Sequence, residues 1–361
     1  MKILSFIDSF SLGGAESVAV NLALGLTGHQ HRVIHFSAAN GIAADRDLVS
    51  RLESAGISCL DLPWNLLSNA RSRREMLRYF EPDVVLCHWW GGAPWRDWVK
   101  AVARRPPGER PTFVCIIHHH GIPAPRGYDF YVPVTHTQVP QVSARPDSIH
   151  VIPNGVDLTR FSSTTPKLRH EMVVGRLSNM REVKIPGNWV RTLAGFHLPA
   201  TRFTIAGSGE MLRTLKAEAT RLGVAKKFSF PGRIAPGDVP RLLSQFDVFC
   251  YATSSAVECC PLVLLESLAA GVPIVAEARG GIPEIVKHRR NGLLASSVAE
   301  IGDHLRTLRR NPHMLALLSE GARHSARRFS LDRQIRSYRV LLAEIERMRA
   351  ESRERGIAEA S

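Results

Sequence analysis

The feature that most constrains the fold of this chain is a regular alternation of short apolar runs with stretches of helical periodicity. The runs are rich in β-branched residues, and the stretches between them space apolar residues as a helix does, for example Val18, Leu22 and Leu26. Such alternation is typical of parallel strands joined by helices, so we expect an α/β fold with helix-covered parallel sheets. The strands predicted in the first half are residues 2–7, 32–36, 57–62, 83–87, 112–117, 130–134 and 149–152.

A polar stretch, residues 157–169, interrupts this alternation and is predicted to be a linker. The pattern then resumes, and the length of 361 residues suits two domains. We therefore expect two doubly wound domains, 1–165 and 166–330, followed by a helix over about 331–350. Ligands bind at the carboxyl ends of the strands in such sheets, so a cleft between the two domains is the expected site. The strands predicted in the second half are residues 170–174, 202–206, 227–230, 247–251, 273–276 and 292–295.

Composition excludes several classes of protein. The chain is 44% hydrophobic and 22% charged, which suits a globular protein and not a disordered one. Its six cysteines show no C-x-x-C spacing, so neither a zinc site nor a disulfide framework is expected. No apolar run is long enough to cross a membrane, and the N-terminus lacks the pattern of a signal peptide. We expect a cytoplasmic protein.

The charge is unevenly distributed. Residues 1–165 carry 16 basic and 14 acidic side chains, whereas residues 166–361 carry 31 and 19. Arginine-rich composition throughout the surface is one explanation, and an anionic ligand bound by the second half is the other. Basic residues interleaved with aromatic ones, which would indicate nucleic acid binding, are absent from the sequence. A small phosphorylated ligand is therefore the expected partner.

Two glycine-containing loops follow predicted strands. In SLGGAES, Gly13 and Gly14 precede a helix whose first N–H groups can meet a phosphate, although a tight turn without a ligand has the same pattern. The second loop, AGSGEML, has Leu212 where the third glycine of a dinucleotide fingerprint belongs. A nicotinamide cofactor is therefore not expected.

Basic and acidic side chains gather after strands of the second half. Arg176 ends the first strand there and Lys184 follows, a pairing that suits a diphosphate, although a solvated surface is the alternative. Glu258 and Glu266 are separated by an apolar run, so a loop and a helix can present both to one cleft, where they can bind the hydroxyl groups of ribose and of a sugar. The helix start at Leu262 and Val263 offers amides to phosphate.

Histidine and tryptophan mark the first half. The fifth strand ends in His118, His119 and His120. Neighbouring residues on a strand point to opposite faces, so at most two of these histidines could bind the same metal ion. Trp89 and Trp90 follow the fourth strand and are either an acceptor surface or core residues. A stretch with Arg71, Arg73, Arg74 and Arg78 beside Trp64, Leu66 and Leu67 is either a solvated helix face or a weak membrane-surface helix, which would place the protein at the inner membrane face.

Taken together, these motifs resemble the retaining glycosyltransferases of family 4, which have the GT-B architecture of two facing Rossmann-like domains. The resemblance covers essentially the whole chain, in the right order. It is carried by G-G-A-E at 13–16, V-I-P-N-G-V-D at 151–157, G-R-L-S with the later K-x-P, E-x(7)-E from Glu258 to Glu266, and G-G-I-P-E at 280–284.

The resemblance implies a role for each motif. Arg176 and Lys184 would bind the diphosphate, with Arg181 competing for the role of Lys184. Glu258 would bind the transferred sugar and Glu266 the ribose. Gly13 and Gly14 would approach the donor from the other domain, and His118, or else His119, would touch the sugar near the reacting carbon. Further donor contacts would come from Arg233, which would flank the base, and from Cys260, Leu262 and Val263. The last helix would pack back on the first domain.

One departure from the family pattern concerns Cys259, which stands where the family commonly has glycine after the first glutamate. The backbone of this loop is therefore expected to differ slightly. The resemblance further implies transfer with retention, without a metal ion, from a UDP-sugar in preference to a GDP-sugar to an acceptor hydroxyl group. The alternatives are an epimerase of nucleotide sugars with the same architecture and a non-catalytic binder of sugar nucleotides.

Overall fold

The structure is a computed structural model that describes residues 1–11, 13–63, 75, 79–89, 99, 110–161, 170–253 and 258–360. Trp90 and the predicted basic helix face with Arg71, Arg73, Arg74 and Arg78 lie outside the described residues. The chain divides into two compact units, one of residues 1–154 with 331–361 and one of residues 155–330.

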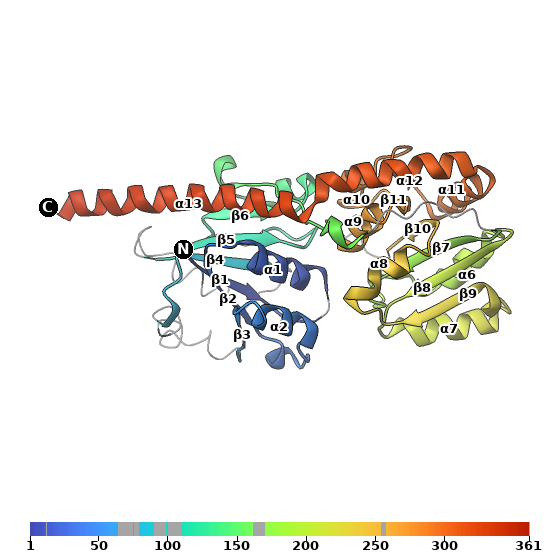
Figure 1. The fold of residues 1–361 in the computed structure, drawn as a ribbon, viewed down its shortest axis with the longest axis horizontal. Helices are drawn as coiled ribbons and strands as arrows, with labels where there is room; N and C mark the ends of the chain where they lie inside the picture. Colours follow the sequence, from blue (N-terminus) through green and yellow to red (C-terminus); the bar gives the residue numbers. More distant parts are fainter. Residues whose placement is uncertain are drawn as a thin grey trace. The chain divides into compact units, whose positions relative to one another are not determined.

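The first unit is built on a six-stranded parallel sheet in the order β3-β2-β1-β4-β5-β6 (Figure 1). Register is continuous from strand to strand, as in the pairing of Ser5 with Val33 and Leu86. The prediction of helix-covered parallel strands is confirmed here. The strands are β1 (Lys2–Ile7), β2 (Gln30–His35), β3 (Ser58–Asp61), β4 (Val84–Trp89), β5 (Thr112–Ile117) and β6 (Phe130–Pro133).

The predicted strand over 149–152 is wrong. Ile149 forms only an isolated bridge to Tyr131, although the amides of His150 and Ile152 still donate to carbonyl groups of β6. A parallel ladder also needs amides of β6 to donate in return, and Pro133, the last residue of that strand, has no N–H. The segment therefore runs beside β6 without becoming a seventh strand.

Among the described residues, the first unit includes the helices α1 (Gly14–Gly25), α2 (Arg46–Glu53) and α13 (Leu331–Ala360) (Figure 1). The long α13 returns to this unit: the side chain of Ile335 lies against Gly25, and the guanidinium of Arg349 donates to Asp83 at 3.1 Å and to the carbonyl of Arg110 at 2.8 Å. The helix extends beyond the predicted end at about residue 350.

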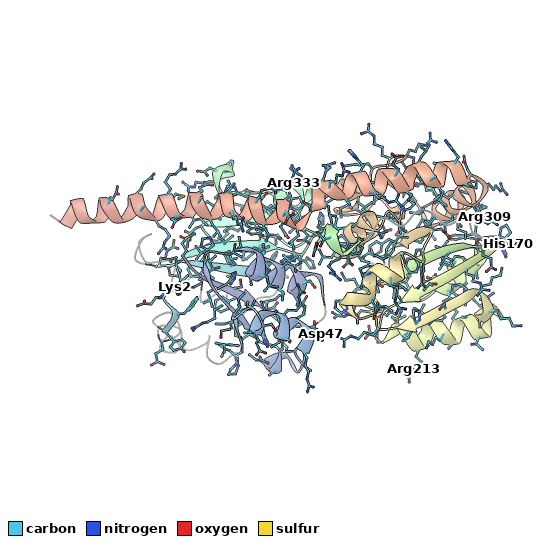
Figure 2. All side chains as sticks on the ribbon, viewed as in Figure 1. Lys2, Asp47, His170, Arg213, Arg309 and Arg333 are labelled. Carbon is cyan, nitrogen blue, oxygen red and sulfur yellow. The ribbon has the colours of Figure 1, made fainter. Side chains whose placement is uncertain are left out.

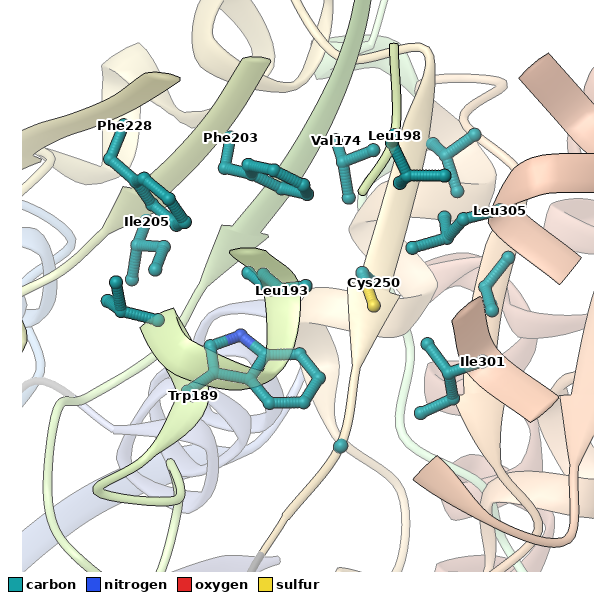
Figure 3. Close-up of a cluster of buried hydrophobic side chains, with 14 of the residues drawn as sticks. Val174, Trp189, Leu193, Leu198, Phe203, Ile205, Phe228, Cys250, Ile301 and Leu305 are labelled. Carbon is teal, nitrogen blue, oxygen red and sulfur yellow. The ribbon is translucent and has the colours of Figure 1, made fainter. Parts of the chain in front are cut away.

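The second unit repeats the architecture, with six parallel strands in the order β12-β11-β10-β7-β8-β9. Figure 3 shows its core, in which Trp189, Phe203 and Cys250 pack with aliphatic side chains from strands and helices. The strands are β7 (Met172–Leu177), β8 (Thr201–Ala206), β9 (Phe228–Gly232), β10 (Val248–Tyr251), β11 (Ile274–Glu277) and β12 (Gly292–Ala295). The helices are α6 (Trp189–Gly195), α7 (Met211–Arg221), α8 (Val239–Leu243), α9 (Leu262–Ala269), α10 (Ile282–Ile285), α11 (Val298–Arg310) and α12 (Pro312–Ala326).

The boundary between the units lies earlier than the predicted residue 165. Gly155 already belongs to the second unit, because the amide of Val156 donates to the carbonyl of Phe329 at 2.8 Å and Val156 bridges Ser330. These contacts join residues that are far apart in the sequence, so composition marks the polar stretch but not the residue at which the core changes.

The basic excess of the second half is largely a surface feature. Figure 2 shows Arg213 and Arg309 at the surface of the second unit, and Arg309 donates to the carbonyl of His170 at 3.2 Å. Within the described residues, no helix combines the length and the apolar character that crossing a bilayer requires.

Candidate functional site

In each sheet, the order of the strands reverses direction between two central neighbours. These are β1 and β4 in the first unit, and β7 and β10 in the second. The connections leave such a pair toward opposite edges, which opens a crevice at the carboxyl ends where α/β proteins bind ligands.

In the second unit, Arg176 spans this point. It lies near the end of β7, and its Nη1 donates at 2.7 Å to the carbonyl of Ala252, which directly follows β10. Its Nη2 donates to the carbonyl of Lys184, and its guanidinium carbon lies 4.8 Å from the centre of the Tyr251 ring. Arg176 is only 1% exposed, and burial lowers its pKa from the ordinary value. Arg176 thus fixes the backbone that carries Lys184, and its guanidinium group is buried against that segment.

Lys184, whose carbonyl accepts from Arg176, forms an ion pair with Glu258. The ammonium group of Lys184 donates to Oε1 of Glu258, and both side chains are partly or largely buried. Tyr251 also bonds Glu258 through its hydroxyl group, and burial together with the Glu258 charge raises the pKa of Tyr251 well above its ordinary value. Arg181, the alternative to Lys184, is exposed. The structure therefore brings Lys184, and not Arg181, together with Arg176 and Glu258.

Glu266 lies on α9, eight residues after Glu258. Burial raises its pKa to about 7, and the positive charge of Arg160 acts in the opposite direction. Pro261 caps α9 in an extended conformation, and Leu262 and Val263 form its first turn. The first turn of a helix has N–H groups without helical partners, which suit a phosphate. The predicted loop-then-helix placement of the two glutamates is what the structure shows.

The remaining predicted donor residues of this unit differ in exposure. Arg233 directly follows β9 and is exposed. Cys260 is 5% exposed, and burial beside Glu258 raises the pKa of its neighbour Cys259 above the ordinary thiol value. The raised pKa keeps the Cys259 thiol neutral, and both cysteines are packed inside the unit. Any contact of Cys260 with a ligand is limited to its backbone or to a narrow part of its side chain.

In the first unit, the loop after β1 holds the predicted glycines and two carboxyl groups. Gly13 precedes α1, and Gly14 is its exposed first residue. The carboxyl group of Glu16 folds back over Gly13, where an added Cβ would meet Oε2 at 2.3 Å. Ser11 donates to Oε1 of Glu16 at 3.1 Å. Burial and the charge of Glu16 raise the pKa of Asp8 to about 7.

Two histidines meet at the carboxyl end of the first sheet. Nδ1 of His88, on β4, lies 3.0 Å from Nε2 of His118, and the two rings stack with their centres 5.3 Å apart. His118 is 8% exposed, and burial lowers its pKa to about 3. His119 is more exposed than His118 and does not share this contact.

Trp89 requires a correction. It is 3% exposed and packs in the core of the first unit with residues of β1 and β5. A surface on which an acceptor stacks needs an exposed ring face, so the structure gives Trp89 the alternative role of a core residue.

The sequence pattern predicted no role for Asp8 or Tyr251, and His88 was predicted only as part of the tryptophan-rich stretch after the fourth strand. Asp8 and His88 each stand at the end of an apolar run, where a polar residue is unexpected unless it serves a site. That signal was available for both. Tyr251 gave none, because an aromatic residue at the end of a strand is ordinary.

The described residues contain no group of three or more histidine, cysteine, aspartate or glutamate side chains arranged to hold a metal ion.

Family models match both halves of the chain. The model described as Glycosyltransferase Family 4 matches residues 12–160, and the model described as Glycosyl transferases group 1 matches residues 166–325. Each match covers most of one of the two α/β units.

Several bacterial glycosyltransferases are similar to this chain in sequence. A GDP-mannose-dependent alpha-(1-6)-phosphatidylinositol monomannoside mannosyltransferase of Mycobacterium tuberculosis is 32% identical over 174 residues, which are 43% of this chain and 45% of that protein. A D-inositol 3-phosphate glycosyltransferase of Saccharomonospora viridis is 29% identical over 208 residues, 52% of this chain and 48% of that protein. The chain thus spans about half the length of the curated relatives it matches.

Solved structures share the fold over nearly the whole chain. Anabaena Alr3699/HepE, solved in complex with UDP and glucose, aligns with a TM-score of 0.75 at 21% identity, covering 95% of this chain and 100% of its own. WaaG, a glycosyltransferase involved in lipopolysaccharide biosynthesis, aligns with a TM-score of 0.67 at 15% identity, covering 94% and 98%. At these identities the likeness shows the fold.

Proposed function

Because this chain belongs to the group 1 glycosyltransferases of family 4 and has their GT-B fold, we propose that it transfers a sugar from a nucleoside diphosphate donor to a hydroxyl group of an acceptor. The observation that carries this proposal is the cluster of Arg176, Lys184 and Glu258 at the point where the second sheet reverses its strand order. It combines two cations with a carboxylate, as a diphosphate joined to a sugar requires.

Each member of the cluster suits a different part of the donor. Lys184 presents a compact charge on a flexible stem, which suits the diphosphate, and its present partner Glu258 acts as a counter-ion in the absence of a ligand. Once the ammonium group turns to the phosphate, the Glu258 carboxylate becomes available to accept hydrogen bonds from the sugar. Arg176 contributes its buried charge and the anchoring of Lys184 more than a direct contact.

Other residues would hold the nucleoside. Glu266 on α9 is placed to accept hydrogen bonds from the ribose hydroxyl groups, and the amides of Leu262 and Val263 suit a phosphate oxygen. Arg233 and Cys260 would border the base and the phosphates. In the first unit, Gly13, Gly14 and His118 would complete the contacts to the donor, and Asp8 and Glu16 lie in the same loop region.

The proposed reaction breaks the bond between the anomeric carbon and the phosphate oxygen. Lys184 and Arg176 would stabilise the negative charge that develops on the departing diphosphate, which is the largest contribution expected for such a transfer. The acceptor oxygen would attack from the face that the diphosphate leaves, and its proton would pass to the leaving phosphate oxygen. The product would keep the anomeric configuration of the donor, and the positive charge comes from side chains, so the scheme requires no metal ion.

For the nucleobase of the donor, we propose uracil in preference to guanine. The sequence resemblance favours UDP, and Alr3699/HepE was solved with UDP, whereas the mycobacterial relative is named as GDP-mannose dependent. The acceptor is proposed only as a hydroxyl compound, such as a glycan precursor, a lipid-linked sugar or a small natural product.

Thermal unfolding of the full chain with UDP, GDP, UDP-glucose, UDP-galactose and GDP-mannose provides the first test. A ligand that binds the native state raises the unfolding temperature by mass action. The nucleotide sugar that is the donor should therefore raise this temperature, and nucleotides that carry the other base should not. Incubation of that donor with simple alkyl glycosides should then give a product whose anomeric linkage, read by the proton coupling constant, matches the donor.

Three results would contradict the proposal. An inverted linkage would remove retention. An epimerised sugar nucleotide formed from donor alone would favour an epimerase, and tight nucleotide binding without hydrolysis or transfer would favour a non-catalytic binder.

A further inference from the structure

One face of the first sheet carries an unusual series of buried polar side chains. Ser5 on β1 bonds His31 on β2 at 2.8 Å, and His88 on β4 bonds His118, just after β5, at 3.0 Å. The parallel register puts all four side chains on the same face of the sheet. This series ends at His118, the residue proposed to touch the donor sugar.

His88 is the member with the least evident structural purpose. It is 0% exposed, and its Nε2 has no hydrogen-bond partner among the described residues. A buried polar atom without a partner destabilises a fold, and an aliphatic or aromatic side chain would fill the same space without that cost. Packing alone therefore does not account for a histidine here.

The contact between His88 and His118 couples their protonation. Burial lowers the pKa of both rings, to about 3 in His118, so both are neutral near pH 7. Two neutral imidazoles share a hydrogen bond only if one nitrogen carries the proton and the other accepts it. The tautomer of His88 therefore determines whether Nδ1 of His118 carries a proton or a lone pair.

We infer that His88 is a positioning residue for the sugar transfer: its hydrogen bond and its stacked ring hold the orientation of His118 and couple the tautomers of the two rings. This inference rests on the proposed function. The stacked geometry supports it, because the two ring planes differ by only 4° and rotation of His118 would break both the stacking and the hydrogen bond.

Three variants separate positioning from simple packing. His88→Phe keeps a buried ring but removes the nitrogen that faces His118, and His88→Asn returns a polar atom near the place of Nδ1. His31→Gln is the matched control, since His31 is buried on the same face but bonds Ser5. Chains labelled with ¹⁵N-histidine, in which His118→Ala assigns the signals, report the His118 tautomer through its two ring-nitrogen shifts.

The wild-type protein should show one defined neutral tautomer of His118 between pH 5 and 8. His88→Phe should convert it into a mixture or into the opposite tautomer, His88→Asn should restore a single form, and His31→Gln should leave the signal unchanged. Turnover should fall by roughly tenfold to a hundredfold in His88→Phe, with nucleotide affinity unchanged, because a small misplacement of a contact to the reacting group has such an effect.

A double-mutant cycle provides the decisive comparison. If His88 acts through His118, the variant with both His88→Phe and His118→Ala should be no slower than His118→Ala alone. Additive losses, or a His118 spectrum that is the same in His88→Phe as in wild type, would overturn the inference. A changed spectrum with unchanged turnover would leave the positioning in place and instead refute the proposed role of His118 in transfer.

Discussion

The ammonium group of Lys184 and the carboxylate of Glu258 meet as an ion pair although 74 residues separate them in the sequence. Lys184 lies on the segment that follows β7, whereas Glu258 lies on the loop before α9. A ligand with a diphosphate and a sugar offers a new partner to each of them. Binding of such a ligand would therefore separate the two side chains of this ion pair.

Substitution of the two members of this pair should have different effects. Lys184→Met should weaken the binding of UDP or GDP, because it removes the cation that we propose binds the diphosphate. Glu258→Gln should leave or improve that binding, because it removes the counter-ion that competes with the phosphate for Lys184. Both should lower turnover by on the order of a hundredfold. Calorimetric titration and a transfer assay measure the two quantities.

Lys226→Met is the control for this comparison, since Lys226 is an exposed lysine of the same unit. Equal losses of nucleotide affinity in Lys184→Met and Lys226→Met would show that only general charge matters.

Arg176 should be essential for stability as well as for activity. In Arg176→Lys, a single ammonium group replaces the guanidinium group that donates to the carbonyls of Ala252 and Lys184. The ammonium group can keep one of these hydrogen bonds at most, so the loss of the other should lower the free energy of unfolding by about 1.5 to 3 kcal/mol. Urea unfolding measures it, with Arg191→Lys at the surface as the control. An unchanged midpoint would mean that the segment of Lys184 is fixed by other contacts.

Donor binding should depend on pH through Glu266. Its pKa is raised to about 7 by burial, so its ionised fraction grows between pH 6 and 8. An ionised carboxylate accepts hydrogen bonds from both ribose hydroxyls, whereas the protonated form loses one acceptor. Affinity for a nucleotide sugar, whose diphosphate diester does not titrate in this range, should therefore rise with pH. Calorimetric titration should show this rise in the wild type and a flat profile in Glu266→Gln. Identical profiles would exclude Glu266 from the ribose site.

Asp8 should make the first unit less stable at high pH. Its pKa is raised from 3.8 to about 7 by burial and by the charge of Glu16, so the folded protein holds a proton that the unfolded chain releases at lower pH. Stability from this group is present below about pH 4 and is lost as the pH rises through 7. Asp8→Asn should raise the unfolding temperature at pH 8 and have little effect at pH 4.

The exposed Asp47 in the same unit provides the control, because Asp47→Asn should not show this dependence on pH. A benefit of Asp8→Asn that is equal at both pH values would mean that the aspartate is ionised throughout.

The sequence alone was enough to predict the parallel α/β architecture, because a strand that is buried on both faces is a continuous run of apolar residues, whichever strands it pairs with. Twelve of the predicted runs correspond to the strands of the two sheets. The strand predicted at 149–152 does not form, because Pro133 of the adjacent strand β6 has no amide N–H to donate. The placement of Glu258 on a loop and Glu266 on a helix was likewise local, since Pro261 stands between them.

Tertiary structure decided which side chains meet. Lys184 rather than Arg181 joins Glu258, Arg176 is buried against the segment of Lys184, and Trp89 is a core residue. The partnership of His88 with His118 also depends on two neighbouring strands having a fixed register. Hydrophobic periodicity can be read from a few consecutive residues. The contacts of a polar side chain depend instead on residues that are tens of positions away in the sequence. The sequence therefore determined the scaffold, and the packing of the strands decided the chemistry placed on it.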